Sequence, residues 1–189
     1  MIAEQPSKDI QNTINYGARH NEEITRSNLN ESLFHGTYAI LYLRKADIKI
    51  HLADLNRCLQ KINEEINSHN DSCYTMPYEG YADYESANQT FSTSTTEMQI
   101  RDAEMYGSTD LERINEELTY VQNSKDGEIN NANFNCGNAL RLISNSLEFQ
   151  KPYCERKRIT INIINWLLVV IALGVGISLG KFGRRWDEK

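Results

Sequence analysis

The chain has few helix-breaking residues and no recognisable catalytic motif. Only three prolines occur among 189 residues, so long helices are permitted. Acidic residues outnumber basic ones by 26 to 20, and this balance argues against a protein that binds nucleic acid. The sequence contains no phosphate-binding loop, no Gly-x-Gly-x-x-Gly, no Gly-x-Ser-x-Gly and no His-Glu-x-x-His. We therefore expect a non-enzymatic protein with no catalytic residue, no metal and no cofactor.

The cysteines show none of the spacings that are typical of zinc sites. They are Cys58, Cys73, Cys136 and Cys154. In a cytosolic protein we expect them to stay reduced. In an exported protein their even number would allow two disulfides, with three possible connectivities. Asn-x-Ser/Thr triplets begin at Asn30, Asn70 and Asn88, and they would matter only in a glycosylating compartment.

One segment near the C-terminus is almost wholly apolar. Residues 159–180 form a run of 22 residues without a charge. As a helix it would span about 33 Å, enough for a hydrocarbon core of about 30 Å. This predicts a single transmembrane helix embedded in a lipid bilayer. Basic residues flank it, and we expect them to contact lipid headgroups. They are Arg156, Lys157, Arg158, Lys181, Arg184 and Arg185.

Small residues recur every four positions inside this span, at Ala172, Gly176 and Gly180. Such spacing lets two helix backbones approach closely, which would suit a partner span or a second copy of the chain. The alternative is that glycine is simply frequent in membrane helices.

The sequence also divides the chain by charge. Residues 1–150 carry 12 basic and 23 acidic residues, whereas residues 151–189 carry 8 basic and 3 acidic residues. We therefore predict an acidic helical head over 1–150, a basic juxtamembrane segment over 151–158, the membrane helix over 159–180 and a short basic tail over 181–189. No apolar signal sequence opens the chain, which predicts tail anchoring with a cytosolic head. Four Lys and Arg residues lie on each side of the span, so their count does not set the orientation.

Two runs in the head alternate steps of four and three between apolar residues, which is the heptad spacing of helices that pack side by side. The first run is Ile48, Leu52, Leu55, Leu59, Ile62 and Ile66, and the second is Leu111, Ile114, Leu118 and Val121. The fold class predicted from them is all-α, with coiled-coil-like seams.

Polar and turn-forming residues predict where the helices break. Residues 70–96 contain one proline, one glycine and many Ser, Thr and Asn residues, so we expect a connector there. Capping boxes that begin at Ser94 and Thr109 predict helix starts near 95 and 109, with a break near Gly107. Asp126-Gly127 predicts a turn. The head is therefore either a long antiparallel hairpin or a four-helix bundle with breaks near Gly36, in 70–96 and near Gly127.

These features predict a single-span membrane protein, tail-anchored, whose helical head binds protein partners, associates with itself or is a structural subunit of a larger membrane assembly. Two alternatives remain open. One is a viral or exported membrane surface protein with disulfides. The other is a tethering or fusion factor.

Overall fold

The computed structural model describes residues 5–26, 28–69 and 72–184, with side chains over 7–26, 28–69, 72–123 and 125–175. Every element in these ranges is a helix, which confirms the all-helical fold class. The elements are α1 (Gln5–Thr25), α2 (Leu29–Ser68), α3 (Tyr78–Met105), α4 (Leu111–Tyr120), a π-helix η2 (Val121–Lys125) and α5 (Asp126–Arg184).

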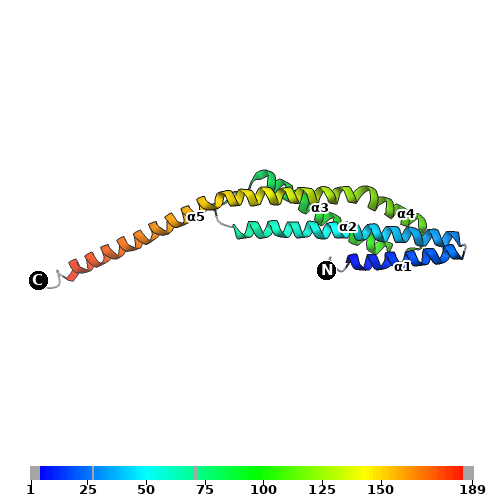
Figure 1. Cartoon of the computed structure of the whole chain (residues 1–189). Coiled ribbons are helices and arrows are strands. Elements are labelled where there is room, and N and C mark those ends of the chain that lie inside the picture. The colour runs from blue at the N-terminus through cyan, green and yellow to red at the C-terminus, as the bar shows by residue number, and fades with distance from the viewer. Residues whose placement is uncertain (1–4, 27, 70–71, 185–189) are drawn as a thin grey trace.

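The molecule is long and narrow (Figure 1). Helices α2 and α5 run side by side through its middle, α1 lies along α2, and α3 lies along α5. The turn between α1 and α2 forms the end of the head farthest from the C-terminus. At the opposite end α5 leaves its neighbours and continues alone. Residues near α5's exit from the head are called proximal below, and those near the α1–α2 turn are called distal.

Helix α2 passes through Gly36 without interruption, so the break expected there is wrong. The chain reverses between α1 and α2 instead. A Cβ atom at Gly36 would lie 2.9 Å from Nδ1 of His20 in α1. The glycine therefore allows the two helices to approach closely and does not end one of them.

The predicted connector over 70–96 is also too long, because α3 already begins at Tyr78. Its hydroxyl side chains are compatible with a helix because several donate to carbonyls one turn earlier, as Thr90 does to Ser86 at 3.1 Å and Thr96 to Ser92 at 3.0 Å. Ser94 is fully buried inside the helix, so the capping box that begins there marks no helix start. A largely polar sequence forms this helix because one narrow face is buried, through Gly80, Ala87 and Ser94 in one half and Met98 and Met105 in the other.

The break near Gly107 and the helix start that follows it are confirmed. Gly107 has a φ of +74°, a conformation that favours glycine. Helix α4 begins at Leu111, and the side chain of Asp110 accepts a hydrogen bond of 3.0 Å from the backbone N–H of Glu112. The capping residue is thus Asp110, one position after the predicted Thr109.

The turn expected at Asp126-Gly127 does not occur. The π-helix η2 joins α4 to α5, and Lys125 at its end lies 3.0 Å from Glu97 and 2.8 Å from Glu128. Helix α5 also continues through Pro152. A proline removes one backbone hydrogen bond and commonly kinks a helix, and the outer part of α5 runs at an angle to the head (Figure 1).

Two clusters of buried side chains fill the head. The distal core contains Tyr38, Leu41, Ile48, Leu52, Met98, Met105, Ile114, Val121 and Ile129. The proximal core contains Leu55, Leu59, Ile62, Ala87, Ala132, Cys136, Ala139, Ile143 and Leu147. The predicted seams therefore pack inside the molecule: five of the six residues of the first run are buried, while Ile66 packs against the proximal core. In the second run Ile114 and Val121 are buried, and Leu111 and Leu118 are half-buried.

Candidate functional site

The first candidate site is the apolar part of α5 beyond the head. Among the described residues, this is the one helix long and apolar enough to cross a membrane, judged by length and composition. Its most apolar window has a mean hydropathy of 1.9, and none of that window is buried. The large apolar side chains between Ile159 and Val175 are 48–72% exposed. A soluble protein seldom exposes so large an apolar surface.

The predicted packing residues lie on this helix. Ala172 is exposed. Helix α5 also includes Gly176, Gly180, Lys181 and Arg184, but only the backbone is described at these positions. Arg185 lies wholly outside the described residues.

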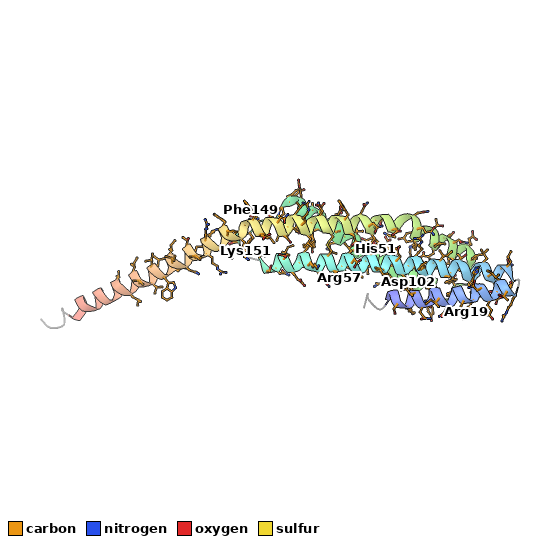
Figure 2. The ribbon with its side chains drawn as sticks, viewed as in Figure 1. Arg19, His51, Arg57, Asp102, Phe149 and Lys151 are labelled. Carbon is orange, nitrogen blue, oxygen red and sulfur yellow. A yellow bond between two sulfur atoms is a disulfide. The ribbon has the colours of Figure 1, made fainter. Side chains whose placement is uncertain are left out.

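Exposed aromatic and basic residues collect where α5 leaves the head. Phe149 is 87% exposed and Tyr153 is 67% exposed. Figure 2 shows Phe149 and Lys151 at this end of the head. The predicted headgroup contacts Arg156, Lys157 and Arg158 follow within two turns and are exposed. Aromatic rings and long cations are typical of the membrane–water interface. Neither aromatic residue was predicted from the sequence, although their position just before the basic cluster was a usable signal.

A disulfide and a pair of hydrogen bonds fasten the head to α5 at the same place. Cys73, just after α2, bonds to Cys154 of α5, with a Cα–Cα distance of 5.6 Å. The backbone N–H of Thr75 donates to Oε1 of Gln150 at 2.7 Å, and Nε2 of Gln150 donates to the carbonyl of Thr75 at 2.8 Å. We call these two connections the proximal clasp. The clasp fixes the point at which the head ends and the free part of α5 begins.

The other two cysteines form a second disulfide inside the proximal core. Cys58 of α2 bonds to Cys136 of α5, with a Cα–Cα distance of 6.2 Å, and Cys136 is fully buried. The structure therefore selects one of the three connectivities, and both Cα distances lie in the range usual for disulfides. No described cysteine remains free.

A buried network of charges links four helices in the distal half, and the sequence analysis did not predict it. Nζ of Lys49 (α2) lies 2.6 Å from Asp9 (α1) and 2.9 Å from Asp102 (α3). Nζ of Lys45 lies 2.8 Å from Asp102 and 3.1 Å from Glu117 of α4. The guanidinium of Arg101 completes the network at 2.8 Å from Glu117 and stacks on the ring of Tyr120, 3.3 Å from its centroid. Three cations and three carboxylates are thus shared among these contacts.

The network shifts the pKa values of its members in different directions. Burial raises the pKa of Asp9, because its single partner Lys49 is shared and does not offset the lost hydration. Burial alone would also raise the pKa of Asp102. The positive charges of Lys45 and Lys49 outweigh this effect and lower the pKa of that carboxyl. Burial would lower the pKa of Lys49, but its two carboxylate partners raise it. The number of oppositely charged partners therefore decides whether the pKa of each group is raised or lowered.

The histidines form no shared centre. Nε2 of His35 lies 3.8 Å from Glu31 within α2, and Nδ1 of His69, just after α2, lies 3.9 Å from Glu65. His51 (Figure 2) lies near Asp47 and Asp126, with ligand atoms within 4.8 Å of one another. Because exposed acidic groups beside a histidine are common on helical surfaces, we assign this trio no metal.

No known protein family, curated protein or solved structure matches this chain.

Proposed function

We propose that this chain is a non-enzymatic, single-span membrane protein whose head is a four-helix bundle that makes protein–protein contacts on the oxidising side of a membrane. One observation carries the proposal. Helix α5 begins in the cores of the head and continues without a break into a segment whose apolar side chains are all exposed. Head and anchor therefore share one rigid element, and the anchor needs a bilayer around it.

The two disulfides support the orientation of the head. The cytosol keeps thiols reduced, whereas exported and virion-surface proteins retain disulfides. All four cysteines are paired, across sequence separations of 78 and 81 residues. This weighs against the cytosolic head predicted from the sequence, so our proposal puts the head outside the cytosol.

The use of polar groups in the head supports a non-catalytic role. The buried charges neutralise one another between helices, and most of the other buried side chains are apolar. Long, rigid and fastened to its anchor, the head suits contact with other proteins at a distance from the bilayer.

The test is a topology measurement on the full chain in intact cell membranes. We expect resistance to alkaline extraction, no thiol labelling before reduction and labelling after reduction under denaturing conditions. Asn88 is exposed on α3, so an exported head should carry a glycan there. Endoglycosidase should then change the mobility of the wild type. The share of this change that comes from Asn88 should be lost in Asn88→Gln and in the matched variant Thr90→Ala, which keeps the asparagine but destroys the triplet. Any change that remains would come from the triplets that begin at Asn30 and Asn70.

Two outcomes would contradict separate parts of the proposal. Extraction by alkali would contradict the anchor. Free thiols together with digestion of the head from the cytosolic side would contradict the orientation but leave the anchor standing, and the protein would then be tail-anchored.

A further inference from the structure

An apolar surface on the α1–α2 hairpin has no partner within the part of the chain that the structure describes. Its members are 44–82% exposed, whereas neighbouring leucines and isoleucines of α2 are buried in the cores. We call it the hairpin patch. It consists of Ile10, Ile14 and Ile24 of α1 with Leu29, Leu33, Ile40, Leu43 and Ile50 of α2.

Helix α1 docks on α2 through polar and aromatic side chains, which leaves its isoleucines free. Asp9 pairs with Lys49, and Nδ1 of His20 lies 2.6 Å from the carbonyl oxygen of Ser32. Tyr16 stacks on the ring of Tyr38 with centroids 4.6 Å apart. These contacts set an antiparallel register in which the start of α1 lies beside the middle of α2. By that register Ile14 lies level with Ile40 and Leu43, and Ile24 lies level with Leu29 and Leu33.

The handedness of the helices brings both sets of apolar residues to one side of the hairpin. An α-helix turns by about 100° per residue. Viewed down α1 from its N-terminus, the isoleucines of α1 lie clockwise of the line along which α1 contacts α2. Viewed down α2 from its own N-terminus, the apolar residues of the patch lie clockwise of the line along which α2 contacts α1. Because the two helices are antiparallel, the same sense of rotation puts both sets on the same side, away from the cores.

The spacing within the patch is that of a helix-packing seam. On α2 the positions 29, 33, 36, 40, 43, 47 and 50 alternate steps of four and three, and on α1 the positions 10, 14, 17, 21 and 24 do the same. Such a repeat specifies a helical partner. Gly17 and Gly36 occupy two of the positions, and Gly36 faces His20 of α1 within the hairpin. Asp47 is the one charged residue among them, and it lies close to Asp126 of α5.

We propose that the hairpin patch is the contact between two copies of this chain, which pack their α1–α2 hairpins face to face about a twofold axis. This inference rests on the proposed role of the head in protein–protein contact and names the partner. Two copies anchored in one bilayer stand parallel, so each seam meets the same seam of its partner, as a twofold contact requires. The protein's own bilayer does not cover the patch, because the α1–α2 turn is at the far end of the head from the anchor (Figure 1).

The apolar area also fits a homodimer. Eight half-exposed aliphatic side chains offer on the order of 400 Å² of apolar surface. A standard interface buries about 800 Å² per partner, of which about 65% is apolar in homodimers. The patch therefore supplies most of the apolar surface that a stable dimer of this kind needs.

The experiment uses the purified full chain in lipid nanodiscs that hold several copies. A photoreactive phenylalanine analogue replaces Leu33 in the patch or, as a matched control, Ile100, which is 55% exposed on α3. We expect a two-copy product on illumination from position 33 and little from position 100. Ile40→Lys with Leu43→Lys should abolish the product at position 33, because opposed charges of one sign lower the association constant by more than about a hundredfold.

Each other outcome overturns the inference. No two-copy product at position 33, equal yields at both positions, or adducts to lipid at position 33 would show that the patch does not join two copies. Circular dichroism and non-reducing mobility check that the double lysine variant is folded. Because only inserted protein enters the nanodisc fraction, failure of the anchor is seen separately.

Discussion

The two halves of the head are stabilised in different ways. The proximal half has both disulfides and a core with many small residues, so its helices lie close together. A Cβ atom at Gly80 of α3 would lie 3.1 Å from the side chain of Ile143 in α5. The distal half has no disulfide, and its core contains larger side chains, stacked tyrosines and the buried charge network. Covalent bonds thus fasten the half next to the apolar part of α5, and electrostatic pairs fasten the half next to the proposed partner.

The two halves of the head should respond differently to a reductant and to the loss of a charge. A disulfide does not depend on pH or salt, but it fails on reduction. A charge network is unaffected by reductant, but it depends on each member remaining present and ionised. Reducing conditions should therefore loosen the proximal half first, whereas loss of one charge should loosen the distal half first.

The largest expected effect comes from placing charge in the proximal core. Leu55 is fully buried and Leu59 is 4% exposed. Leu55→Asp with Leu59→Asp should remove about 5 kcal/mol or more of stability, because each carboxylate would be buried without a partner. Urea unfolding followed by circular dichroism measures this. Ile100→Asp is the control, with a change within about 0.5 kcal/mol expected at an exposed site. A wild-type midpoint for the double variant would show that the seam is not a core.

The second-largest loss of stability should come from removing one charge of the buried network, and it should be confined to the distal half. Lys49→Met leaves Asp9 buried without its cation, which should cost about 3–5 kcal/mol. Hydrogen exchange should rise throughout α1 and remain low near the disulfides. Adding Asp9→Leu should restore much of the loss, since the unpaired charge is then gone. Lys8→Met, at an exposed position, is the control. An equal rise in hydrogen exchange in the distal and proximal halves would contradict this difference between the two halves.

Opening the proximal clasp should have a similar or smaller effect on stability, confined to the proximal half. Cys73→Ala with Cys154→Ala should cost about 2–5 kcal/mol. Exchange should rise around residues 72–77 and stay unchanged in α1. Mild reduction of the wild type should reproduce this pattern. If the reduced protein unfolds at the wild-type denaturant concentration, the disulfides do not stabilise the head.

The smallest effect concerns pH. The pKa of Asp9 is raised in the folded protein, so the folded state takes up this proton before the unfolded chain does. Stability from Asp9 therefore rises as the pH falls through its folded pKa. The pKa of Asp102 is lowered, so its contribution is present above the unfolded value and is lost only as the pH falls through its lower folded pKa. Between neutral pH and about pH 4, the wild type should gain stability relative to Asp9→Asn. A loss over this range would mean that Lys49 outweighs burial at Asp9.

Local patterns predicted the features that depend on neighbouring residues. The helical class and the long apolar C-terminal helix could be predicted because periodicity and length are properties of one segment. The break at Gly107 and the start of α4 followed from a glycine and a capping residue. The same local signals failed at Ser94, Gly36 and Asp126-Gly127. There, packing against another helix outweighed the local preference, since a buried face stabilises a helix more than a turn signal destabilises it.

By itself, the sequence determined that this chain is helical, that its C-terminal helix is long and apolar enough to cross a membrane, and that four cysteines and an acidic head precede that segment. Only the tertiary structure decided which cysteines pair, which charges meet and which apolar residues remain exposed. Asp9 and Asp102 reach Lys49 from 40 and 53 positions away, and Cys73 reaches Cys154 from 81 positions away. Such contacts depend on how whole helices pack, and no local spacing in a single sequence specifies that.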